Sequence, residues 1–241
     1  MSSIADKQRL REQVWARIAA DPGVRTAVPP AGRIPGFQQA EAAAQRLAQL
    51  TEWRAARALK SNPDTPQLPV RRLALEQGKR LYMAVPKLAT ERPFIALAAA
   101  PGVSAELLAS SDGAQRHGVP TRLEELPPID LIVCGTVAVN PDGVRIGKGA
   151  GYADLEYALL AELGLVTEST WIATTVHDVQ VLEQELPETE HDFRVDFVVT
   201  PTRVIRCPRG RRPKGVLAEH LDADKIAAIP ALVARQSPRQ P

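Results

Sequence analysis

The chain has 241 residues, 44% of them hydrophobic and only 4% aromatic, so aliphatic side chains must build most of a sizeable core. Its 30 Lys and Arg against 28 Asp and Glu give a net charge of +2, which is too balanced for nucleic-acid binding by the whole surface. The N-terminus lacks the apolar core of a signal peptide, and no apolar run reaches the ~20 residues that cross a membrane. Two distant cysteines without a CxxC pattern fit a reducing, cytoplasmic setting.

In chain order, the first half predicts helices where apolar residues recur every three or four positions, and strands where short apolar runs lie between turn residues. The segment 62–69 contains three prolines and is expected to be a loop. Polar residues 116–128 are expected to be irregular. Helices are expected over residues 6–20, 37–53, 70–77 and 104–110, and strands over residues 55–61, 80–85 and 94–98.

The second half contains the strongest predicted element, an almost continuous apolar run over residues 129–139. Such a run is typical of a strand buried on both faces of a parallel sheet. The basic segment 206–214 is expected to be a solvated loop, and a flexible tail is expected from about residue 236. Also expected are a helix over residues 154–163, strands over residues 171–176, 195–200 and 202–207, and a last helix over residues 222–235, interrupted or kinked at Pro230.

Strands that alternate with helices in this way predict an α/β fold. We expect one domain over residues 1–241, built on an open, mostly parallel sheet with helices on both faces. Ligands of such sheets bind at the carboxyl ends of the strands. The glycine-rich segment, Asp154 and His177 all follow predicted strand ends, so one site is expected to gather them.

The most informative segment joins the apolar run to the next predicted helix. It contains Gly147, Lys148, Gly149, Ala150 and Gly151 in succession. Alternate glycines let the backbone adopt positive φ angles and turn its N–H groups inward, which makes an anion site at the start of a helix. With the charges of Arg145 and Lys148, this segment predicts a triphosphate site. It matches neither the Walker A motif nor G-x-G-x-x-G, and the alternative interpretation is a tight structural turn.

Four segments, in order, resemble the 5-formyltetrahydrofolate cyclo-ligase family over most of residues 6–205. RIGKGAGYAD, at residues 145–154, resembles its phosphate-binding loop. KQRLR at residues 7–11, Val85-Pro86-Lys87, and HDFRVDFVVTP at residues 191–201 resemble three further family segments. The amino-acid sequence of the glycine-rich segment is similar to that of a divergent branch of the family, the methenyltetrahydrofolate-synthetase-domain proteins. That branch includes paralogues associated with thiamine metabolism rather than proven cyclo-ligase activity.

The resemblance implies a NagB/RpiA/CoA transferase-like fold and an ATP- and Mg²⁺-dependent ligase of one-carbon metabolism, a monomer or homodimer acting on a folate-like substrate. In this reaction ATP phosphorylates the formyl oxygen of 5-formyltetrahydrofolate, and ring closure with loss of phosphate gives 5,10-methenyltetrahydrofolate. Lys7 and Arg11 lie four residues apart on one helix face, so both can reach the same phosphates. The implied phosphate-binding residues are Lys7, Arg11, Arg145, Gly147, Lys148, Gly149, Ala150, Gly151 and Tyr152, and of these Lys7, Arg145 and Tyr152 are the implied catalytic residues.

The resemblance further implies that Asp154 and Asp192 hold Mg²⁺, and that Asp64, Thr65 and Tyr152 contact the substrate. For Asp154 the alternative role is a helix N-cap, which contributes about 1 kcal/mol.

The departures from the family pattern fall on the folate side. Prolines reshape the loop at residues 61–66, Ala153 replaces a second Tyr, and the expected Gly-Ile-x-Glu-Pro is at best Gly118-Val119-Pro120. Two rival functions therefore stay open. One is an ATP-using enzyme that acts on another substrate, with a possible thiamine link, and the other is a non-catalytic nucleotide- or folate-binding module.

Overall fold

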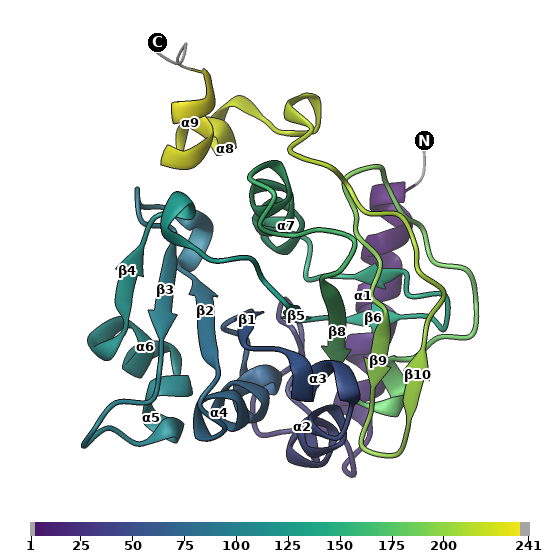
Figure 1. Cartoon of the computed structure of the whole chain (residues 1–241). Coiled ribbons are helices and arrows are strands. Elements are labelled where there is room, and N and C mark those ends of the chain that lie inside the picture. Colours follow the sequence, from purple (N-terminus) through teal and green to yellow (C-terminus); the bar gives the residue numbers. More distant parts are fainter. Residues whose placement is uncertain (1–2, 237–241) are drawn as a thin grey trace.

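The computed structural model describes residues 3–236, and their centre is an eight-stranded sheet (Figure 1). The strand order is β10-β9-β8-β5-β1-β2-β3-β4. The pairs from β9 to β2 are parallel, while β10, β3 and β4 add antiparallel edges. The predicted open, mostly parallel sheet is thus confirmed. Its strands are β1 (Ala58–Ser61), β2 (Arg80–Ala84), β3 (Phe94–Leu97), β4 (Val119–Thr121), β5 (Leu131–Cys134), β8 (Trp171–Thr175), β9 (Phe197–Val199) and β10 (Val204–Arg206).

Helices cover both faces of the sheet, as the apolar strands require. One face packs against α2 (Ala40–Ala48), α3 (Thr51–Ala55), α4 (Leu68–Glu76), α5 (Ala105–Ala109) and α6 (Ser111–His117). The other face packs against α7 (Tyr152–Glu162) and α9 (Pro230–Gln236), which follows α8 (Ala223–Ala227). In β5, Ile132 and Cys134 face α7 while Leu131 and Val133 face the opposite helices. This double burial explains the continuous apolar run.

The first helix, α1 (Ser3–Ala20), packs beside the main sheet against a small antiparallel hairpin. The hairpin consists of β6 (Ala138–Val139) and β7 (Arg145–Ile146). Leu10, Val14 and Ile18 form the buried stripe of α1, as predicted from their spacing. Because β7 leads directly into the glycine-rich segment, this packing brings the N-terminal half of α1 next to that segment.

The structure corrects several predicted boundaries. The helix expected over residues 37–53 is two helices, because Leu50 adopts an extended conformation and begins α3, in which Trp53 is buried. The strand expected over residues 129–139 ends at Cys134, because the chain leaves the main sheet at Gly135 and pairs with β7 instead. The segment 116–128 contains β4, and the loop 62–69 already contains the start of α4. The last helix is interrupted rather than kinked, as one of the two expectations had it, with Pro230 beginning α9. The predicted flexible tail lies almost wholly outside the described residues.

Residues 207–214 form a loop, as predicted, but several arginines of the basic segment 206–214 contact the rest of the protein. Arg212 forms a buried ion pair with Asp196 at 2.6 Å. Arg206 pairs with Glu52, and the guanidinium of Arg209 lies 3.9 Å from the centre of the Trp171 ring. These arginines hold the segment against the sheet edge.

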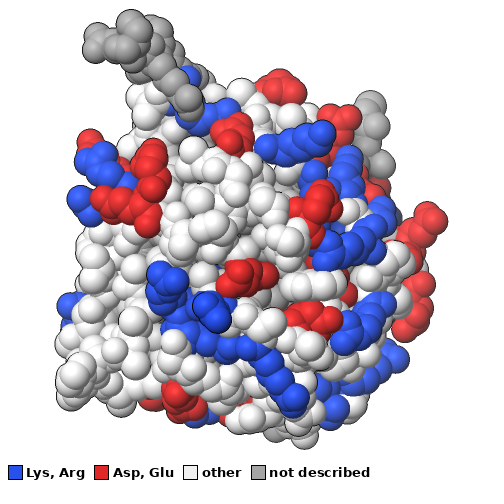
Figure 2. Space-filling model, in the orientation of Figure 1, with Lys and Arg blue, Asp and Glu red and all other residues white. Residues whose placement is uncertain are grey.

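Charges of both signs are interspersed over the face of the molecule seen in Figure 2. Among the described residues, no helix has the length and apolar character needed to cross a membrane.

Candidate functional site

A cleft of about 420 Å³ lies where the adjacent parallel strands β5, β1 and β2 end. Open α/β sheets bind ligands at such carboxyl ends. The glycine-rich segment and the first turn of α7 form the opposite wall of the cleft. Its lining residues are Ile34, Asn62, Pro63, Asp64, Ala84, Val85, Pro86, Lys87, Gly135, Arg145, Gly147, Lys148, Ala150, Gly151, Tyr152, Ala153, Asp154 and Glu156.

Residues 147–151 form an exposed loop, here called the glycine loop, between β7 and α7. Gly149 has φ +110° and Gly151 has φ +69°, backbone angles that residues other than Gly rarely adopt. Gly151 is the N-cap residue of α7, so the positive end of the helix dipole points at the loop. Unpaired N–H groups at a helix start and a flexible glycine backbone are what a phosphate group requires.

Arg145 lies beneath this loop and pairs with Asp154 at 2.5 Å. Burial alone would lower the pKa of Arg145, but the combined effect of Asp154, its hydrogen bond and the other nearby acidic groups outweighs burial and raises the pKa, so the guanidinium stays charged. Its Cζ also lies 4.0 Å from the centre of the Phe193 ring. The N-cap interpretation of Asp154 is wrong, because Gly151 occupies that position and the carboxylate binds Arg145.

Lys7 and Arg11 extend from α1 on a side that does not line the cleft, and Arg11 contacts the glycine loop. Arg11 Nε donates to Gly147 O at 2.7 Å, and Lys7 Nζ lies 2.5 Å from Asp192 Oδ2. Burial would raise the pKa of Asp192, but Lys7 and hydrogen bonds from Thr189 outweigh it and lower the pKa. The two cations therefore share one helix face, but Arg11 contacts the glycine loop while Lys7 contacts Asp192 and Thr189.

Of the two residues of the β1 loop that were predicted to contact the substrate, one lines the cleft and the other does not. Asp64 lines the cleft, and its Oδ1 accepts from Lys148 Nζ at 3.2 Å, so this pair joins the β1 loop to the glycine loop. Thr65 is exposed and begins a short 3-10 turn away from the cleft lining. The cleft lining therefore includes Asp64 but not Thr65.

His177 also lies apart from the cleft, against the expectation from its place after β8. Its ring contacts Phe37 edge-on at 6.0 Å between centroids, and its Nδ1 accepts from the Val179 backbone N–H. Burial lowers the pKa of His177 below its ordinary value. Its role is to begin the 3-10 turn over residues 178–180.

The carboxylates of Asp154 and Asp192 are the predicted Mg²⁺ ligands. Each uses one carboxylate oxygen for a basic partner, Arg145 or Lys7. The other oxygens, Asp154 Oδ2 and Asp192 Oδ1, accept no hydrogen bond within residues 3–236. No group of three or more His, Cys, Asp and Glu side chains that could hold a metal occurs in this part of the chain. Two carboxylates with free oxygens still fit Mg²⁺, which takes its other ligands from phosphates and water.

Three buried charged residues, an ion pair and an arginine, were not predicted from the sequence. Lys60 on β1 pairs with Glu156 on α7, and both are at least 96% buried. Arg71 on α4 is 1% exposed, and its guanidinium donates to the carbonyls of Asn62 and Asp64 at 2.6 and 2.9 Å. The available signal was a charged residue within an otherwise apolar strand or helix, because such charges are rarely buried without a partner.

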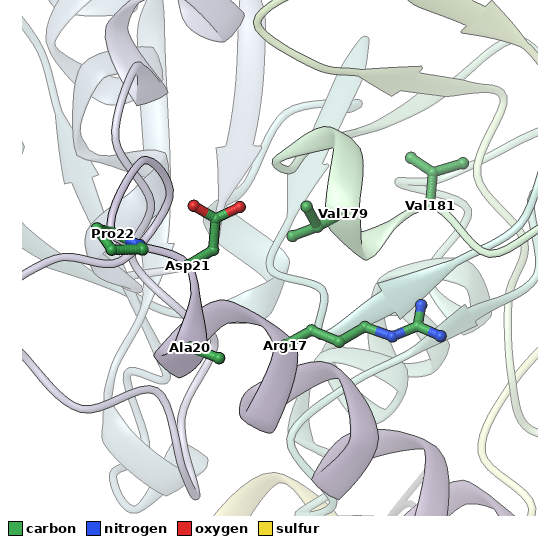
Figure 3. Close-up of a pocket in the computed structure, with 6 residues that line it drawn as sticks. All are labelled: Arg17, Ala20, Asp21, Pro22, Val179 and Val181. Carbon is green, nitrogen blue, oxygen red and sulfur yellow. The ribbon is translucent and has the colours of Figure 1, made fainter.

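A second hollow lies at the C-terminal end of α1 (Figure 3). Its two charged residues, Arg17 and Asp21, extend in different directions. Ten helical residues, roughly 15 Å, separate Arg17 from Lys7. The hollow brings none of the predicted site residues together. Its lining residues are Arg17, Ala20, Asp21, Pro22, Val179 and Val181.

Residues 3–201 match the model of the 5-formyltetrahydrofolate cyclo-ligase family. The chain belongs to this family. Membership agrees with the four resembling segments and supports a folate-related function. Within the cyclo-ligase family, the chain is similar to methenyltetrahydrofolate synthase domain-containing proteins. That of Mus musculus is 39% identical over 94% of this chain and 62% of its own length, and that of Homo sapiens is 38% identical over 94% and 60%. The chain thus spans about three fifths of these relatives.

A solved cyclo-ligase-family structure shares the fold. The NMR structure of Aquifex aeolicus 5,10-methenyltetrahydrofolate synthetase matches with a TM-score of 0.54 at 23% identity, over 89% of this chain and 99% of that chain. The mostly parallel sheet with helices on both faces is therefore the fold of a known cyclo-ligase-family member.

One contact to the glycine loop comes from outside the family match. Lys225 on α8 donates to Ala150 O at 2.6 Å, and its Nζ lies 4.9 Å from the centre of the Tyr152 ring. Burial lowers the pKa of Lys225, although Asp222 and Asp154 oppose the shift. The C-terminal segment therefore adds a further cation beside the loop, which no sequence pattern indicated.

Proposed function

We propose that the chain binds ATP with its triphosphate on the glycine loop and a folate-like substrate in the adjoining cleft. The observation that carries the proposal is the exposed loop at the start of α7, with Arg11, Arg145 and Lys148 around it. The proposed reaction is that of the family, in which the protein positions the γ-phosphate against a formyl oxygen and neutralises the developing charge. Lys7 and Arg145 supply that charge, and Tyr152 flanks the substrate without a proton-transfer role.

The proposed metal site uses Asp154 and Asp192. Their free carboxylate oxygens would hold Mg²⁺ between the protein and the phosphates. The metal would supply charge neutralisation there. Arg145 and Lys7 would continue to orient the two carboxylates through the opposite oxygens.

Calorimetry with MgATP tests the triphosphate assignment. We expect saturable binding, weakened on the order of 10-fold by Arg11→Ala, because charged hydrogen bonds contribute about 1.5–3 kcal/mol. Lys148→Ala should weaken binding by about threefold or more, since this side chain is exposed and its charge is screened. Arg17→Ala, an exposed position on the same helix, is the matched control and should bind like the unmodified protein. If Arg11→Ala and Lys148→Ala also bind normally, the phosphate assignment is wrong.

The metal assignment predicts that Asp154→Asn loses the tightening of ATP binding by Mg²⁺. The same change leaves buried Arg145 without its counter-charge, so a loss of stability is expected as well. Asp196→Asn breaks the comparably buried pair with Arg212, far from the glycine loop in sequence and outside the cleft lining, and controls for that loss. ATP titrations with and without Mg²⁺ separate the two effects. A normal Mg²⁺ dependence in Asp154→Asn would reduce Asp154 to a structural partner of Arg145.

A second candidate function is ATP-dependent chemistry on a substrate other than 5-formyltetrahydrofolate. The observation that favours it is the altered folate side, where Ala153 lines the cleft and Thr65 lies outside it. A third is a nucleotide- or folate-binding module without turnover. An assay with ATP, Mg²⁺ and 5-formyltetrahydrofolate separates them. Methenyl product supports the family reaction, ATP hydrolysis only with another metabolite supports the second function, and binding without turnover supports the third.

A further inference from the structure

Glu156 is an unusual lining residue of the cleft, because it is a carboxylate with only 4% of its surface exposed. It lies on the buried side of α7, among apolar neighbours in sequence. Its Oε2 is held by Lys60 and accepts from Asn62 Nδ2 at 3.1 Å. Asn62 is itself fixed, because its Oδ1 accepts from the Gly135 N–H at 3.2 Å. The carboxylate is therefore oriented rigidly at the base of the cleft.

The second oxygen of this carboxylate is left for a ligand. Glu156 Oε1 accepts no hydrogen bond from residues 3–236. It is also not fully enclosed by protein atoms, unlike the buried polar atoms that lack a partner. It therefore reaches the cleft surface. A buried carboxylate oxygen that lacks a donor costs about 1–3 kcal/mol unless a ligand or water satisfies it. Lys60 supplies the counter-charge that lets the group stay buried.

The surroundings define what this oxygen can bind. Ile34, Ala84 and Ala153 give the cleft apolar walls, and these suit a flat ring. A carboxylate oxygen only accepts hydrogen bonds, so it does not bind the oxygens of a phosphate, which the cations of the glycine loop attract instead. The preferred occupant is thus an uncharged, flat ring that presents N–H donors.

We infer that Glu156, oriented by Lys60 and Asn62, is a specificity-determining residue that accepts hydrogen bonds from the amino edge of a 2-aminopyrimidinone ring. This is the ring edge that a folate presents, so the inference rests on the proposed function and names the group by which the substrate is recognised. The carboxylate makes no bond to the reacting atoms. Its role is to set affinity and the orientation of the ring.

The test combines a protein change with a ligand change. Binding of 5-formyltetrahydrofolate, and of its analogue without the 2-amino group, is measured for the unmodified protein and Glu156→Gln. The unmodified protein should bind the analogue about 10- to 100-fold more weakly, as expected for a hydrogen bond to a charged group. Glu156→Gln should bind both ligands weakly and with similar affinity. Its MgATP affinity should not change.

Two further variants keep the result interpretable, because Glu156→Gln leaves Lys60 buried without a counter-charge and lowers stability. The double variant Lys60→Met with Glu156→Gln removes both charges and should show the same loss of discrimination between the ligands. Asp196→Asn should lose stability but keep full discrimination.

Three outcomes would overturn the inference. If Glu156→Gln and the unmodified protein distinguish the two ligands equally well, Glu156 does not recognise the 2-amino group. The proposed function would remain intact. Loss of MgATP affinity in Glu156→Gln, without loss of folate affinity, would place adenine rather than the folate ring at this carboxylate. A protein that binds MgATP but no folate would end the inference and the folate half of the proposed function together, and would leave the triphosphate site standing.

Discussion

Replacing Arg71 by Met should lower the free energy of unfolding by about 3–5 kcal/mol, the largest stability effect that we expect for a residue outside the apolar core. The guanidinium donates to the carbonyls of Asn62, Asp64 and Ala109 at 2.6, 2.9 and 2.8 Å. Met fills a similar volume but donates nothing, so these carbonyls lose their partner. Burial lowers the pKa of Arg71 to about 10, because the guanidinium loses its hydration in the protein interior.

The neighbouring residue provides the control. Arg72 is partly exposed and pairs with Glu41 and Glu76, so Arg72→Met should change stability by less than about 1 kcal/mol. Urea denaturation of both variants measures the difference. Arg71→Met should also weaken ligand binding in the cleft, because Asn62 and Asp64 would lose the bonds that fix their backbone. If the free energy of unfolding of Arg71→Met is within 1 kcal/mol of that of the unmodified protein, the loop that contains Asn62 and Asp64 does not depend on Arg71 for its stability.

The second large effect concerns turnover. We expect the chain to convert 5-formyltetrahydrofolate at least on the order of 100-fold more slowly than Aquifex aeolicus 5,10-methenyltetrahydrofolate synthetase assayed beside it, because a displacement of ~1 Å costs about that factor. The structure supports a changed substrate side. Ala153 lines the cleft where the family pattern has a Tyr, and Thr65 is exposed and is not one of the lining residues. Val119, in the segment that corresponds to Gly-Ile-x-Glu-Pro, lies exposed on an edge strand.

The same reasoning predicts that Ala153→Tyr does not restore full activity, since several features differ rather than one. ATP binding should be retained in both forms, because the change lies outside the glycine loop. Absorbance of the methenyl product under saturating ATP and Mg²⁺ gives the rate. A rate for the unmodified chain equal to that of the synthetase would show that the altered cleft still aligns the formyl oxygen with the γ-phosphate.

The local sequence by itself determined the elements whose physics is short-range. The spacing of Lys7 and Arg11 predicted that they share one helix face, from which Arg11 contacts the glycine loop and Lys7 contacts Asp192. The alternate glycines predicted the positive φ angles of Gly149 and Gly151. The apolar run through β5 predicted a strand buried on both faces, which sets the order of the layers. In each case the determining residues are within one turn or one strand of each other, so the pattern is visible in a short window.

Tertiary structure alone decided which charges share the cleft. Asn62 and Glu156 are 94 residues apart, and Lys225 lies 75 residues from the carbonyl that it binds. No periodicity relates such positions, because their contact depends on the order of the strands in the sheet and the docking of α7 and α8. The same holds for Asp154, because only the fold shows that α7 begins at Tyr152 and that β7 places Arg145 within 2.5 Å of the Asp154 carboxylate. A buried charge takes its partner from whatever the fold places beside it, since the free energy of leaving it unpaired exceeds any local preference.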